Sequence, residues 1–206
     1  PKVVQVPDPR PAPEGSEPYY FLCRGKKIYP VDIDRMKRLG WGALNTVKLK
    51  TRRKGKKHFV LLDPKPLVAY FKNNPVGDTF FRLTVEISNY VPRLVLNRRP
   101  EAGEDAGQLA AKGSDYQHVL RTIKGKKRYA RFHVHGDSFD TYIAARRVCD
   151  SYGIPAGWQP TGGKNDWTTY FPIRLEIAGK PKPKPKPKPD EPEEPKKEPL
   201  PRSDID

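Results

Sequence analysis

Apolar and polar positions follow their clearest pattern between residues 128 and 161, where they predict a strand, a helix and a second strand. They alternate from Arg128 to Val134, which is the period of a strand. The spacing then becomes helical, with one mostly apolar stripe through Phe139, Tyr142, Ile143, Arg146 and Cys149. Gly153 suits the left-handed conformation that ends many helices, and the apolar run Ile154 to Trp158 is typical of a strand.

The helix of this unit needs an N-cap, and either Asp137 or Ser138 can supply it. A short side-chain oxygen at that position accepts a hydrogen bond from a backbone N–H of the first turn. We therefore expect Ser138 to be structural rather than a nucleophile, because no Gly-x-Ser-x-Gly sequence surrounds it.

The same patterns predict further elements on both sides of this unit. A hairpin is expected from 19–23 and 27–31, followed by a short helix over 35–39 that Asp32 or Asp34 caps and Gly40–Gly42 ends. Next come a strand over 58–62, a helix that opens at Pro64 and Pro66, and an alternating strand over 81–88 that pairs with 93–97. A helix capped by Ser114 and a strand over 170–177 complete the series.

This order of elements predicts an α+β fold, with a mixed, mostly antiparallel sheet, helices packed on one face, and one β-α-β unit. Proline is concentrated at the two ends of the chain. We expect a Pro-rich linker over 1–18, a globular domain over 19–178 and a disordered Lys-Pro and Glu-Pro tail over 179–206. Alternating proline in the tail favours an extended polyproline II conformation.

The net charge of +16 belongs almost entirely to the predicted domain. The tail has 8 basic and 7 acidic residues, so the rest of the chain carries +15. A strongly basic domain attracts anionic partners such as nucleic acid, anionic lipid or an acidic polymer. No apolar run of about 18 residues is present to span a bilayer.

Two groups of basic residues are candidates for contacts with anions: Arg52, Arg53, Lys54, Lys56 and Lys57, and then Lys126, Lys127, Arg128 and Arg131. The first group lies in the segment 48–57, which we expect to be an exposed loop because its like charges repel one another. Proteins that bind single-stranded nucleic acid combine such charges with exposed aromatic rings. Here only Tyr129 and Trp167 lie outside core-spaced positions, so nucleic acid is a secondary expectation.

Histidine and cysteine give few candidates for chemistry. His133, His135 and Asp137 would share one face of a strand end, as in a fragment of a hydrolase metal motif, but only His58 and His118 remain to complete a zinc site. We expect no catalytic, metal or cofactor site, and keep a metal-dependent hydrolase as an alternative. Cys23 and Cys149 are expected to be buried thiols, with a disulfide possible in an oxidising compartment.

Two stretches, YYFLCRGKKIYPVDID and GDSFDTYIAARRVCDSYGIPAGWQP, resemble a family of uncharacterised, membrane-anchored proteins from planctomycete-type bacteria. The β-α-β unit is also similar, more remotely, to the periplasmic domain of the ExbD/TolR family of biopolymer transport proteins. The alternating Lys-Pro and Glu-Pro tail is similar to the linker by which TonB crosses the periplasm.

The resemblance implies a non-enzymatic domain of the cell envelope, in the periplasm and anchored to the inner membrane by a segment upstream of Pro1. The proton-carrying Asp of the ExbD/TolR family lies in a transmembrane helix, so no position of this chain inherits that role. The expected partner is a protein of the inner membrane or envelope, with an anionic polymer, lipid head groups or a second copy of the chain as further possibilities. A basic module that binds nucleic acid is the alternative.

Overall fold

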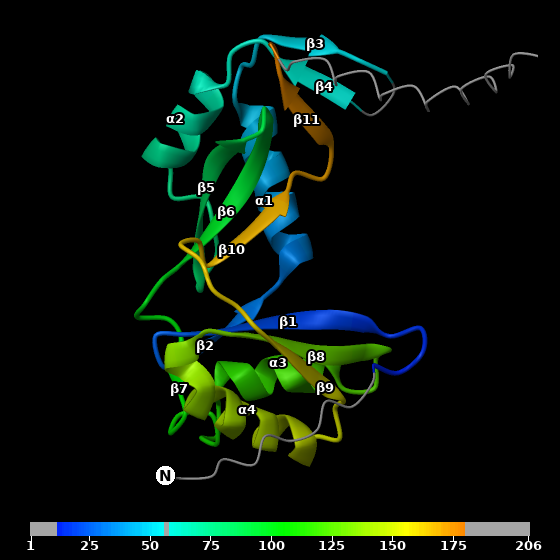
Figure 1. Cartoon of the computed structure of the whole chain (residues 1–206), viewed down its shortest axis with the longest axis vertical. Helices are drawn as coiled ribbons and strands as arrows, with labels where there is room; N and C mark the ends of the chain where they lie inside the picture. The colour runs from blue at the N-terminus through cyan, green and yellow to red at the C-terminus, as the bar shows by residue number, and fades with distance from the viewer. Residues whose placement is uncertain (1–11, 56–57, 180–206) are drawn as a thin grey trace, which may run out of the picture.

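The computed structural model describes residues 12–55 and 58–179, which form an α+β fold as predicted (Figure 1). Most of both Pro-rich ends, at 1–11 and 180–206, lies outside the described residues. The first strand begins at Glu17, two residues before the predicted domain boundary.

The elements follow one another along the chain as six strands and two helices, then five strands and two helices. The first set is β1 (Glu17–Arg24), β2 (Lys27–Val31), α1 (Ile33–Thr46), β3 (Thr51–Arg53), β4 (His58–Leu61), α2 (Lys65–Asn73), β5 (Phe81–Ser88) and β6 (Val91–Arg98). The second set is β7 (Glu104–Asp105), α3 (Asp115–Ile123), β8 (Arg128–Val134), α4 (Phe139–Ser151), β9 (Ala156–Pro160), β10 (Trp167–Tyr170) and β11 (Arg174–Ile177), with a 3₁₀ turn at Gly136–Ser138 before α4.

Five strands form one mixed sheet in the order β7-β2-β1-β8-β9, which we call the large sheet. β1 pairs with β8 in parallel, and β8 with β9 in parallel, so the predicted β-α-β unit is confirmed. The hairpin β1–β2 is confirmed as well. Helices α3 and α4 cover one face of this sheet (Figure 1).

A second unit lies against the opposite face of the large sheet (Figure 1). It is built from the chain between β2 and β7 and from the chain that follows β9. Its strands form two three-stranded sheets, in the orders β10-β6-β5 and β11-β4-β3, which pack with α1 and α2 around a second core. The strands are thus divided among three sheets, because the chain leaves the large sheet after β2 and returns to it only at β7.

β1 contributes to both hydrophobic cores. Phe21 and Cys23 point into the core under α3 and α4, whereas Leu22 points into the core of the second unit. Successive side chains of a strand point to opposite faces, so a strand between two cores must be apolar on both sides. Cys149 lies in the first core; both cysteines are buried and free, as expected.

The predicted end of the first helix was wrong. Asp32 caps α1 through a 2.9 Å bond from the Arg35 N–H to its Oδ1, but the helix continues through Gly40 and Gly42 to Thr46. A Cβ atom at position 40 would lie 2.6 Å from Cδ1 of Leu94 in β6. Glycine is needed there because the helix lies close to the sheet, and it does not end the helix.

Three other predictions need correction. The segment 48–57 is not simply a loop, since Thr51–Arg53 pairs with β4 as β3. The predicted strand 170–177 is two strands, β10 and β11, in different sheets. Neither Asp137 nor Ser138 makes a capping hydrogen bond to α4; both bind the β1–β2 turn instead.

Candidate interaction site

The solvent side of α1 carries an accessible groove centred on Trp41. Trp41 lies three or four residues from Lys37, Arg38 and Asn45, and Asp34 lies three or four residues before Lys37 and Arg38, so the five residues share one face of the helix. Trp41 is 36% exposed, which is high for so large an aromatic residue.

Two adjoining hollows make up this groove. One, of about 250 Å³, lies at the C-terminal half of α1 and has mostly apolar walls, including Leu44, Val47, Leu49, Phe59, Ile173 and Leu175. The other, of about 420 Å³, lies along the N-terminal half and is lined by Asp34, Lys37, Arg38 and Pro172. Trp41 and Ile173 border both hollows, so we refer to them together as the Trp41 groove.

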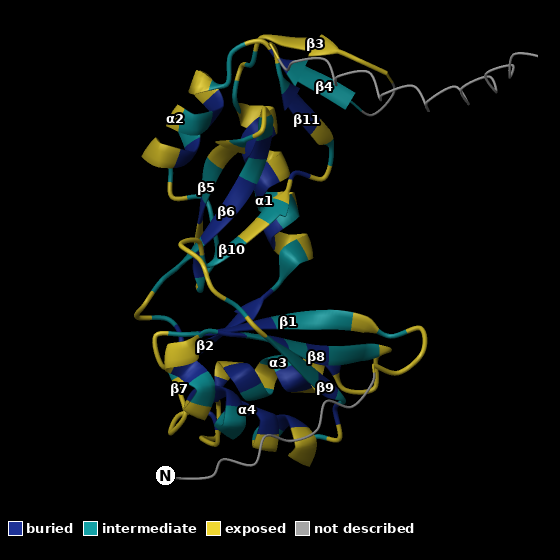
Figure 2. Ribbon diagram, in the orientation of Figure 1, coloured by how far each residue is buried: buried dark blue, intermediate teal, exposed yellow. Residues whose placement is uncertain are grey.

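The surroundings of the Trp41 groove are strongly basic. Between Ile33 and Gly55 the chain has one acidic residue, Asp34, and eight basic ones: Arg35, Lys37, Arg38, Lys48, Lys50, Arg52, Arg53 and Lys54. All of these basic residues except the half-buried Lys37 are exposed, and β3 is exposed along its length (Figure 2). Apart from Arg53, none of them forms an ion pair with a described residue.

The structure separates the two predicted groups of anion-contact residues. Arg52, Arg53 and Lys54 lie at β3, beside the Trp41 groove, while Lys56 and Lys57 lie outside the described residues.

The other group belongs to the large sheet, in the other unit (Figure 1). Lys126 and Lys127 are exposed in the turn before β8. Arg128 lies 3.9 Å from the Glu17 carboxylate, and the Arg131 guanidinium donates a 2.7 Å hydrogen bond to Gln159. These charges therefore do not form one continuous basic face.

Sequence reasoning missed Lys37, Arg38 and Trp41. The signal was present, because Asp34, Lys37, Arg38, Trp41 and Asn45 have helical spacing. Gly40 and Gly42 conceal this pattern, because two glycines in a sequence predict the end of a helix.

His133 lies between aromatic rings rather than in a reactive cluster. Its ring centroid is 4.2 Å from that of Trp167 and 5.7 Å from that of Tyr20. Burial, with smaller contributions from Arg131 and His135, lowers the pKa of His133 to about 4. The imidazole is therefore neutral near pH 7.

The Asp137 side chain stabilises the β1–β2 turn through hydrogen bonds. Its Oδ2 accepts a 3.0 Å hydrogen bond from the Gly25 N–H, and its Oδ1 accepts one of 2.8 Å from the Ser138 hydroxyl. Ser138 Oγ in turn accepts a 2.8 Å bond from the Lys26 N–H. Within residues 12–55 and 58–179, no group of three or more His, Cys, Asp or Glu residues could hold a metal ion.

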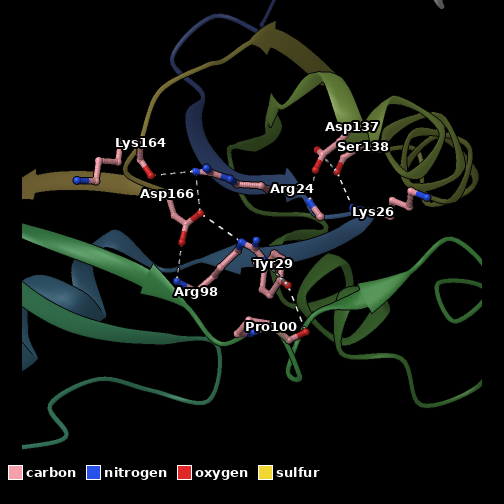
Figure 3. A network of polar contacts seen from close by, with 10 residues as sticks. Arg24, Lys26, Tyr29, Arg98, Pro100, Asp137, Ser138, Lys164 and Asp166 are labelled. Atoms are coloured by element: carbon pink, nitrogen blue, oxygen red, sulfur yellow. Dashed lines mark hydrogen bonds and ion pairs between the residues drawn. The ribbon is translucent and has the colours of Figure 1, made fainter.

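A polar network joins the two units beside this turn (Figure 3). The Asp166 carboxylate, which is 14% exposed, lies 3.0 Å from Arg24 Nη1 and 3.3 Å from Arg98 Nε. The same carboxylate accepts a 2.9 Å hydrogen bond from the Arg98 backbone N–H. Arg24 ends β1 and Arg98 ends β6, so this network fixes the large sheet to the second unit.

No family model, curated protein or solved structure matches this chain. In the described part of the chain, no helix has the length and apolar character needed to cross a membrane.

Proposed function

We propose that this chain is a non-enzymatic interaction domain that binds a partner through the Trp41 groove. The proposal is carried by one observation: an apolar hollow lies among exposed basic side chains, of which Arg38, Lys48 and Lys50 form no ion pair with a described residue. Charged groups at a rim steer an oppositely charged partner, and a buried apolar contact supplies most of its affinity. The network at Asp166 has the opposite character, because its charges are paired with one another.

We further propose that the domain is extracytoplasmic and belongs to a single-span inner-membrane protein, loosely like the transport components of the ExbD/TolR family. The two stretches that carry the resemblance support this idea by lying in one folded unit. The first includes most of β1 and all of β2, and the second includes α4 and β9. β8 pairs with both β1 and β9, and so connects them.

The location can be tested with the complete gene product in its native cell. An epitope placed after Asp206 should be digested by protease added to spheroplasts, whereas a cytoplasmic marker protein should remain intact. Protection of the epitope until the inner membrane is lysed would place the domain in the cytoplasm and refute the envelope assignment.

A nucleic-acid-binding module is the second candidate, favoured by the exposed Arg52, Arg53 and Lys54 of the β3 region. Binding through phosphates weakens steeply as salt rises. Retention on single-stranded DNA that falls with salt, and is lost when these three residues are changed to Gln, would support it. Equal retention of the Gln variant would contradict it.

A further inference from the structure

We infer that the Trp41 groove binds an extended, acidic peptide segment of a partner protein, with one large apolar side chain inserted beside Trp41. This inference rests on the proposed function as an interaction domain, and it specifies the chemistry of the ligand. Three features carry it: the apolar hollow, the charge around it, and the length of the groove.

The apolar hollow suits a single side chain better than a free small molecule. Its volume of about 250 Å³ is below the range of roughly 300–1,000 Å³ that is typical of small-molecule sites. Its walls come from α1 and from all three strands of the β11-β4-β3 sheet, elements that pack around the second core. A large apolar residue inserted into such a fixed pocket is the usual anchor of a protein interface.

The charge around the hollow requires acidic residues next to that anchor. Lys37 and Arg38, together with Asp34, line the N-terminal end of the groove. Lys48 and Lys50 line neither hollow, but their exposed side chains add positive charge next to Val47 and Leu49 of the apolar hollow. A peptide with acidic residues on both sides of its anchor would place opposite charges near both groups. A basic peptide would be repelled by these lysine and arginine side chains, so the groove discriminates against basic partners.

The length of the groove sets the length of the segment. From Asp34 to Asn45 the helix rises about 16 Å, at about 1.5 Å per residue. An extended chain covers about 3.3 Å per residue, so about five residues fill the groove.

The shape of the site favours a peptide over a lipid bilayer. Aromatic residues that anchor a protein to a membrane surface protrude into the head groups. Trp41 instead forms a wall shared by two hollows, and nearly two thirds of its surface is covered. A concave, walled site of this kind receives a side chain.

The inference can be tested by fluorescence anisotropy with the whole 206-residue chain and a labelled seven-residue peptide, in which one leucine stands between acidic residues. We expect binding that weakens as salt rises, because opposite charges are screened. A peptide with glycine in place of the leucine should bind at least about tenfold more weakly, because the anchor is lost. A peptide with lysine in place of the acidic residues should not bind.

Variants of the chain locate the site. Lys37→Glu combined with Arg38→Glu should weaken binding by about tenfold or more, whereas Lys126→Glu combined with Lys127→Glu, on the other unit, should change it by less than about twofold. Trp41→Ala should also weaken binding. If that variant does not fold, Asn45→Phe, which places a ring in the hollow from an exposed position, should block the peptide instead.

Several results would overturn the inference. The first is that the leucine peptide does not bind. The second is that the Lys126 and Lys127 variant loses as much affinity for the peptide as the Lys37 and Arg38 variant. The third is that the chain binds vesicles of one part phosphatidylglycerol to three parts phosphatidylethanolamine through the groove but does not bind the peptide. The protease experiment on spheroplasts is independent of these measurements. If the domain is extracytoplasmic but does not bind the peptide, the proposed ligand is refuted and the proposed location is not. If the domain binds the peptide but is cytoplasmic, only the proposed location is refuted.

Discussion

At the scale of single residues, His133 illustrates how surroundings determine the role of a side chain. In the sequence it stands two residues before His135 and four before Asp137, a pattern that suggested a metal motif. In the structure its ring lies beside Trp167 and Tyr20, and its Nδ1 is 3.4 Å from Nε2 of Gln159. Contact with aromatic rings disfavours the charged imidazolium, because it removes water from the ring.

This environment predicts an acid-sensitive stability. The pKa of His133 is about 4 in the folded chain and about 6.5 in an unfolded one, so the unfolded state binds the proton more readily. The stabilisation that the neutral His133 ring contributes to the folded state is complete above pH 6.5 and is lost as the pH falls towards 4. Because the ring is only half-buried and partly screened, we expect a loss of about 1–2 kcal/mol.

The measurement is urea unfolding at pH 7 and at pH 4.5, together with an NMR titration of the His133 ring. The His133→Phe variant, which cannot bind a proton, should lose less stability over this interval than the parent chain. An NMR titration midpoint near 6.5 would show that the ring is not shielded from water.

At the scale of elements, α1 shows why a helix can contain glycine for reasons of packing. Gly40 is buried against Leu94, whereas Gly42 is exposed and a Cβ atom there would meet nothing within 4 Å. Two glycines that look equivalent in the sequence therefore have opposite roles. One allows the helix to approach the sheet closely, and the other only weakens the helix.

Substitution of each glycine by alanine should separate these roles. Gly42→Ala should stabilise the chain by about 0.5–1 kcal/mol, because alanine has the higher helix propensity. Gly40→Ala gains the same propensity but pushes against Leu94, and overpacking costs about 1–3 kcal/mol. Urea unfolding should therefore find Gly40→Ala the less stable of the two. Equal stability would mean that the helix and β6 are not in close contact.

At the scale of the whole molecule, the two units share β1 and are joined by the network around Asp166. Each face of β1 lies in a different hydrophobic core, so loss of one core exposes the strand that the other core needs. The chain is therefore expected to unfold in a single cooperative transition, with equal calorimetric and van't Hoff enthalpies.

Asp166→Ala should test the connection between the units. Removal of this carboxylate leaves Arg24 and Arg98 without the counter-charge between them, and we expect a loss of about 1–3 kcal/mol. The matched control is Glu101→Ala, at an exposed carboxylate in the loop after β6, which should change stability by less than about 0.5 kcal/mol. Similar losses in both variants would show that the network does not hold the units together.

The sequence alone determined the fold class and most of the local elements of this protein, but not β3, the end of α1 or the break between β10 and β11. The alternation of Ala130, Phe132 and Val134, the helical stripe of α4 and the Ser114 cap depend on neighbours in the chain, which a sequence displays. It also located the basic segment 48–57, whereas the strand β3 within that segment emerged only from the tertiary structure.

Only the tertiary structure decided which segments meet. It brings Gly40 against Leu94 and pairs Asp166 with Arg24, and both contacts join residues more than 50 positions apart in the sequence. It also places the two basic groups in different units. The Trp41 groove likewise exists only because α1 reaches the β11-β4-β3 sheet. Contacts between distant segments depend on how two cores close around β1, and local spacing carries no information about that closure.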